Sequence, residues 1–136
     1  MSNSQTIKIG VIGVGYLGEF HIQQLQIIDN IYLIGLSDIN SDRGTSISTE
    51  YNVQHYKNPN DLIEKCDGII IATPTNSHYE IAKNILEKGK HVFIEKPITS
   101  TIEQVNELIE LANINNGLIQ VGHIERFNPA FLLLKE

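Results

Sequence analysis

The chain has 136 residues, a formal net charge of −6, 41% hydrophobic residues and one cysteine. This length gives room for one domain with a sizeable core. The acidic balance gives no general electrostatic reason to bind nucleic acid or an anionic membrane. No apolar run is long enough to cross a bilayer. A single cysteine excludes an internal disulfide or a thiolate metal cluster. The first residues lack the layout of a secretory signal, so we expect a cytoplasmic protein without a metal site.

Short apolar runs rich in β-branched residues alternate along the chain with segments of helical spacing. Such runs, bounded by turn residues, are typical of buried parallel strands. Six strands are expected, at residues 7–12, 31–38, 53–56, 68–73, 91–97 and 118–122. Helices are expected between them, at residues 16–28, 41–52, 59–65, 76–89 and 100–117, the last capped by Ser100 or Thr101.

This alternation predicts an α/β fold, a doubly wound parallel sheet of about six strands in the order 3-2-1-4-5-6. We expect this nucleotide-binding domain to occupy residues 1–122. Residues 123–136 begin an apolar helix after Pro129 and are expected to start the crossover to a substrate domain that is absent. The apolar side of that helix must then be exposed, disordered or paired with another copy of the chain, as in a homo-oligomer.

A glycine pattern, G-x-G-x-x-G, follows the first expected strand at Gly13, Gly15 and Gly18. Between a strand and a helix it indicates a dinucleotide site, since the first glycine permits a tight turn, the second lets backbone approach a pyrophosphate, and the third lets helix and strand pack closely. The N–H groups at the start of the helix, at Tyr16 and Leu17, then face the phosphates. The alternative is a purely structural glycine turn.

A carboxylate, Asp38, ends the second expected strand, twenty residues beyond Gly18. There it can accept hydrogen bonds from both ribose hydroxyls of an adenosine, and it would repel a 2′-phosphate. NAD is therefore favoured over NADP. Arg43 weakens that preference, because it could swing toward a phosphate. In the alternative interpretation, Asp38 simply caps the next helix.

Two further segments follow strands on the other side of the expected switch point, where ligands of such sheets bind. Thr73, Pro74 and Asn76 are candidates for contacts to ribose and nicotinamide. His78 belongs to the same candidate cofactor site, although a surface or packing role is favoured over acid–base chemistry. Lys96 could take the hydroxyl proton of an alcohol that gives up a hydride, or could be a solvated surface residue.

Five ordered segments, GVIGVGYLGEFH, SDIN, ATPTNSHYEIA, EKP and GHIERFNPA, together resemble the N-terminal half of the Gfo/Idh/MocA oxidoreductases. The resemblance runs over residues 7–130. The last segment is most similar to members that oxidise nucleotide-linked amino sugars, such as UDP-N-acetylglucosamine 3-dehydrogenases. The resemblance implies NAD-dependent hydride transfer from a hydroxyl of a sugar or nucleotide sugar.

The resemblance also implies roles for single residues. Lys96 of E-K-P would be the catalytic acid–base residue, Glu95 would line the cofactor site, and Pro97 would follow a bond that is often cis. Arg126 and Asn128 of R-F-N-P would lie beside the cofactor, where the chain crosses into the next domain.

Members of this family usually exceed three hundred residues, and their second half binds the substrate and supplies a further catalytic histidine. That half is absent here, so we do not expect catalysis by this chain alone, because the reactants would not be oriented. Two functions stay open: the cofactor half of an NAD-dependent sugar oxidoreductase, and a non-catalytic NAD(H)-binding module or truncated remnant that acts through a partner. The residues that would choose the sugar are not present.

Overall fold

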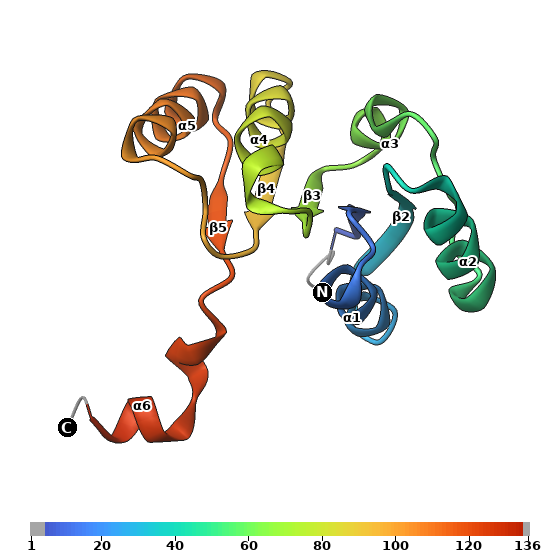
Figure 1. Cartoon of the computed structure of the whole chain (residues 1–136). Coiled ribbons are helices and arrows are strands. Elements are labelled where there is room, and N and C mark those ends of the chain that lie inside the picture. The colour runs from blue at the N-terminus through green and yellow to red at the C-terminus, as the bar shows by residue number, and fades with distance from the viewer. Residues whose placement is uncertain (1–4, 135–136) are drawn as a thin grey trace.

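The computed structural model describes residues 5–134. A parallel sheet forms the centre of the molecule (Figure 1). The described residues contribute five strands in the order β2-β1-β3-β4-β5. The strands are β1 (Ile7–Ile12), β2 (Ile31–Ser37), β3 (Gly68–Ile71), β4 (His91–Ile94) and β5 (Ile119–Val121). The helices are α1 (Tyr16–Leu25), α2 (Ser41–Tyr51), α3 (Pro59–Lys65), α4 (His78–Glu87), α5 (Ile102–Asn115) and α6 (Pro129–Leu133), with short 3-10 turns at η1 (Thr75–Ser77) and η2 (Ile124–Phe127).

Two apolar cores lie on opposite faces of this sheet, because successive side chains of a strand point to opposite sides. In the fully buried strand β3, Ile69 and Ile71 belong to one core and Ile70 to the other. The first core includes residues of α3, α4 and α5, and the second includes residues of α1 and α2. The sheet is therefore covered on both faces, and the predicted doubly wound α/β fold is confirmed.

Side-chain caps fix where four of the described helices begin, three that cover the sheet and α6. Asn40, Asn58 and Thr101 each accept a hydrogen bond from a backbone N–H in the first turn of α2, α3 and α5, respectively. Caps of this kind stabilise a helix by about 1 kcal/mol. Of the two caps expected for the last of these helices, Thr101 is the one used. The first helix differs, because its N-cap residue is Gly15 and no side chain caps it.

The expected strand at residues 53–56 is wrong. His55 forms one isolated parallel bridge with Leu36 of β2, supported by backbone hydrogen bonds from Leu36 to Gln54 and from Tyr56 to Leu36. The chain then turns into α3, whose cap is Asn58, before a second pairing forms. Residues 5–134 thus contribute five strands, and removing the segment at residues 53–56 from the expected order leaves the observed order.

The segment after β5 leaves the sheet and projects from the body of the molecule (Figure 1). It consists of η2 and α6, and its apolar side chains include Phe127, Leu133 and Leu134, which are 78%, 72% and 83% exposed. The position of the domain boundary at residue 122 stays a prediction. No helix within residues 5–134 combines the length and the apolar character that crossing a membrane requires.

Cys66, which follows α3, provides a test of the packing on this face of the sheet. It is 1% exposed, and burial raises the pKa of its thiol to about 12, against the opposing charge of Lys90. Because the thiolate is the reactive form, the native chain should not react with a disulfide reagent such as DTNB at pH 8, four units below that pKa. In denaturing guanidinium chloride the same assay should count one thiol. Fast reaction of the native chain would contradict this packing of α3.

Candidate functional site

The candidate site lies where four neighbouring strands end at their carboxyl edge. Backbone hydrogen bonds hold the residues that follow these strands side by side: Gly13 donates to Ser37 at 2.8 Å, Ala72 to Ile12 at 2.9 Å, and Glu95 to Ile71 at 3.0 Å. These bonds align the ends of β2, β1, β3 and β4 in that order. The glycine turn, the Asp38 loop, the β3–α4 loop and the E-K-P segment therefore form one continuous edge, at the switch point of the sheet.

The three glycines of the turn are required for different reasons. Gly13 has φ +89°, and a Cβ there would lie 2.7 Å from the backbone of Ala72. A Cβ on Gly18 would lie 1.8 Å from the carbonyl oxygen of Gly13. Gly15 has an ordinary φ of −64°, and a Cβ there would meet no atom within 4 Å. The fold itself thus explains Gly13 and Gly18, whereas the open space at Gly15, beside the uncapped start of α1, is available to a ligand.

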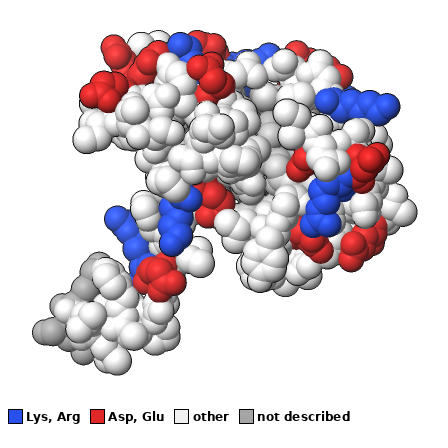
Figure 2. Space-filling model, in the orientation of Figure 1, with Lys and Arg blue, Asp and Glu red and all other residues white. Residues whose placement is uncertain are grey.

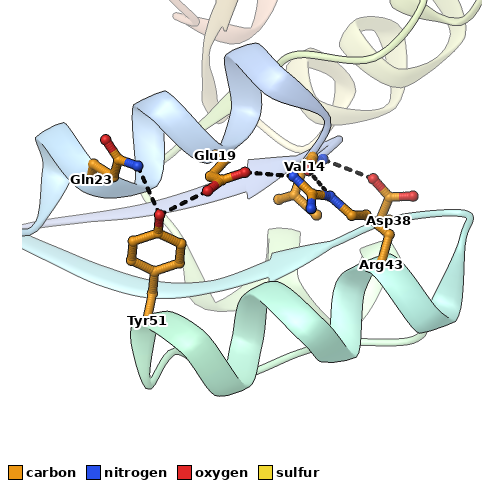
Figure 3. Close-up of polar contacts among 6 residues, drawn as sticks. All are labelled: Val14, Glu19, Gln23, Asp38, Arg43 and Tyr51. Atoms are coloured by element: carbon orange, nitrogen blue, oxygen red, sulfur yellow. Dashed lines mark hydrogen bonds and ion pairs between the residues drawn. The ribbon is translucent and has the colours of Figure 1, made fainter.

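Asp38 faces this turn from the end of β2 (Figure 3). One carboxylate oxygen accepts the backbone N–H of Val14 at 2.7 Å, and the other accepts that of Asn40 at 2.7 Å. The alternative in which Asp38 caps α2 is wrong, because Asn40 is the cap and accepts the N–H of Arg43 at 3.1 Å. The carboxylate is therefore fixed beside the glycine turn, with two of its four lone-pair positions in use.

The guanidinium of Arg43 is held between α1 and α2 (Figure 3). Its Nε donates to the carbonyl oxygen of Val14 at 2.9 Å, and a terminal nitrogen donates to Glu19. The other carboxylate oxygen of Glu19 accepts the hydroxyl of Tyr51 at 2.8 Å. The bonds from Tyr51 and then Arg43 lower the pKa of the Glu19 carboxyl. Arg43 is therefore engaged within the chain.

The β3–α4 loop lies directly against the glycine turn. The methyl group of Thr73 is among the atoms nearest to the missing Cβ of Gly13, and Pro74 and Asn76 are exposed. His78 is 1% exposed, with Nδ1 3.0 Å from the carbonyl oxygen of Pro97 and Nε2 2.8 Å from that of Thr73. Its buried ring thus links this loop to the E-K-P segment from inside the protein, so no direct contact between His78 and a cofactor is proposed.

The E-K-P segment follows β4, which ends at Ile94, one residue before it. Glu95 is 8% exposed, and its Oε1 lies 2.7 Å from Nε2 of His21 on α1. The ring of His21 packs edge-on against Phe93, with the ring centres 5.2 Å apart. Sequence reasoning missed His21 as a partner of this site, because no local signal connects a helix residue with a strand end 74 residues away.

Lys96 is exposed, and the peptide bond between it and Pro97 is cis, as the resemblance implies. The segment after β5, residues 122–134, is called the C-terminal arm below. Lys96 lines a cavity of about 220 Å³ together with five residues of this arm, His123, Ile124, Glu125, Arg126 and Phe131. Figure 2 shows basic and acidic side chains where this arm leaves the body. Asn128 does not line the cavity, and it caps α6 by accepting the N–H of Ala130 at 3.0 Å.

Comparison with known proteins agrees with this arrangement. The model of the Gfo/Idh/MocA family, described as an oxidoreductase family with an NAD-binding Rossmann fold, matches residues 7–123. The chain belongs to this family. The resemblance carried by the five sequence segments is thereby confirmed, and the edge described above lies within the family's NAD-binding fold.

Several relatives of this chain are named as dehydrogenases of a nucleotide sugar or an inositol. UDP-N-acetylglucosamine 3-dehydrogenase of Acidithiobacillus ferrooxidans is 34% identical over 130 residues, which are 96% of this chain and 41% of that protein. Its solved structure superposes with a TM-score of 0.89. Myo-inositol 2-dehydrogenase of Thermotoga maritima is also 34% identical, over 96% of this chain and 40% of that protein. The solved structure of an NAD-binding protein from Listeria innocua, 30% identical, has a TM-score of 0.90 over 97% of this chain and 40% of that one. The chain thus spans about two fifths of the relatives that it matches.

Substitutions at Gly18 and Gly15 distinguish a glycine that the fold requires from one whose missing Cβ would meet open space. Gly18→Ala should destabilise the chain by about 3 kcal/mol or more, because its Cβ would collide with a backbone carbonyl. Gly15→Ala should change the free energy of unfolding by less than about 1 kcal/mol, because its Cβ enters open space at an ordinary φ. Urea unfolding followed by circular dichroism measures both. Equal losses for the two variants would contradict the geometry of the turn.

Proposed function

We propose that the chain is the cofactor-binding half of an NAD-dependent oxidoreductase that removes hydride from a hydroxyl of a sugar or nucleotide sugar. One observation carries the proposal. Gly15 has no steric reason of its own to be glycine, yet it stands at the switch point of a sheet, beside an uncapped helix start. A pyrophosphate approaching the backbone there is what would require the missing Cβ.

The residues of the turn suit a pyrophosphate. The backbone N–H groups of the first turn of α1, around Tyr16 and Leu17, have no side-chain cap, and the positive end of the helix dipole favours an anion there. The N–H of Val14 already donates to Asp38, so the donors for phosphate begin at Gly15. These groups would hold the phosphates of the cofactor.

NAD rather than NADP is the proposed cofactor, because of Asp38. Each of its carboxylate oxygens accepts one backbone N–H, and each retains a lone-pair position for a ribose hydroxyl. A 2′-phosphate in the same place would meet a fixed negative charge. Arg43, the residue that could compensate that charge, is bound to Glu19 and Val14.

The nicotinamide end would lie over β3 and β4, where it supplies a hydride acceptor. Thr73, Pro74 and Asn76 are proposed to border its ribose, since their loop adjoins the glycine turn. Glu95 is proposed to line the same part of the site, held in place by His21.

Lys96 is proposed to be the catalytic acid–base residue. It is exposed at the end of the same edge, where its amine would take the proton of the substrate hydroxyl as the hydride leaves. Arg126 lines the cavity beside it, and Asn128 supports this arm by capping α6. The cavity opens next to the apolar arm, so we propose that a substrate domain or a second copy of the chain covers Lys96 and the arm.

A non-catalytic NAD(H)-binding module is the second candidate. In that case the site would hold NAD(H) without orienting a substrate for hydride transfer. Both candidates need the same cofactor site. The single buried cysteine suits a reducing cytoplasm for either of them.

Nicotinamide fluorescence tests the cofactor site. The chain should bind NADH in the micromolar range and NADPH more weakly, and Asp38→Ala should weaken NADH binding by about tenfold or more, since two charge-assisted hydrogen bonds are lost. Asp42→Ala, which removes the same charge from an exposed position of α2, is the matched control and should bind as the parent chain does. A folded chain that binds neither nucleotide would contradict the proposal.

A further inference from the structure

Two residues five positions apart, Asp38 and Arg43, are of the types that favour NAD and NADP, respectively. Asp38 suits the free ribose hydroxyls of NAD, and an arginine near this position is the kind of residue that accepts the 2′-phosphate of NADP. Arg43 lies in the first turn of α2, directly after the loop that contains Asp38. The position of its guanidinium therefore bears on which cofactor the chain accepts.

A continuous chain of hydrogen bonds between α1 and α2 fixes that guanidinium (Figure 3). Gln23 donates to the hydroxyl of Tyr51 at 2.7 Å, Tyr51 donates to one oxygen of Glu19 at 2.8 Å, and Arg43 donates to the other. The backbone carbonyl of Tyr51 also accepts the side-chain amide of Gln26 at 2.8 Å, which anchors the end of α2 to α1. One carboxylate oxygen of Glu19 thus binds Tyr51, and the other binds Arg43.

The charges along this chain favour the engaged state of Arg43. The bonds from Tyr51 and Arg43 lower the pKa of the Glu19 carboxyl, so it stays anionic at neutral pH. The bond from Gln23 lowers the pKa of the Tyr51 phenol, but the neighbouring Glu19 carboxylate and burial outweigh it, so that pKa is raised and the phenol remains a donor. A phosphate must therefore compete with a bound carboxylate and with the carbonyl of Val14 for the same guanidinium.

We infer that Glu19 and Tyr51 are specificity-determining residues, which hold Arg43 against the glycine turn and prevent it from pairing with the 2′-phosphate of NADP. The inference rests on the proposed function, because it concerns the same cofactor site. Asp38 disfavours the 2′-phosphate by repulsion, whereas Glu19 and Tyr51 act by keeping the Arg43 guanidinium hydrogen-bonded elsewhere.

The test uses Glu19→Gln and Tyr51→Phe, singly and together, in the 136-residue chain. Releasing Arg43 should strengthen NADPH binding by about tenfold in the double variant, and less in each single variant, while NADH binding changes by less than about twofold. Adding Arg43→Ala to the double variant should abolish the gain in NADPH binding. Glu50→Gln is the matched control, since it removes the same charge from an exposed position of α2 and should give no gain.

The outcomes separate the two proposals. A chain that binds NADH, with variants that gain no affinity for NADPH, would overturn the role of Glu19 and Tyr51 and leave the cofactor site standing. A gain that Glu50→Gln reproduces, or that survives Arg43→Ala, would also overturn it. A folded parent chain that binds neither nucleotide would overturn both. Circular dichroism checks folding, and the single variant Glu19→Gln decides the question if the double variant does not fold.

Discussion

The contact between Gly18 and the carbonyl oxygen of Gly13 is the constraint on which the site depends. An added Cβ would come within 1.8 Å of that oxygen, so helix α1 can follow strand β1 this closely only without a side chain. The close approach brings the start of α1 to the end of β1. It also leaves the N–H of Val14 directed at Asp38, which ties the turn to the end of β2.

From this turn, the site extends along the sheet edge through buried polar links. Thr73 lies against the turn, and His78 joins the carbonyl groups of Thr73 and Pro97 from within the protein. His21 joins α1 to Glu95 in the same way. These buried and half-buried links hold the glycine turn, the β3–α4 loop and the E-K-P segment in fixed positions relative to one another.

Sequence reasoning found those parts of the site that have a local signal. The strand β1, the three glycines and Asp38 follow one another within a single βαβ unit, so spacing alone predicts their relation. The prediction of a strand at residues 53–56 was wrong because the composition of four residues does not show how many backbone pairings with β2 will form, and only the isolated bridge between Leu36 and His55 is present among the described residues. The pairs His21–Glu95 and Glu19–Tyr51 are 74 and 32 residues apart and depend on how α1 and α2 are placed by the folded sheet.

In the proposed function a dinucleotide lies along this edge, from the open space at Gly15 to Lys96. Amide NMR spectra of the ¹⁵N-labelled chain, recorded with increasing NAD⁺, test it most directly because they locate the ligand residue by residue. We expect shifts at Gly15, Tyr16 and Thr73 and at the loop after β4, with little change in the middle of α5. Shifts confined to α5 or the C-terminal arm, or none at all in a folded chain, would contradict it.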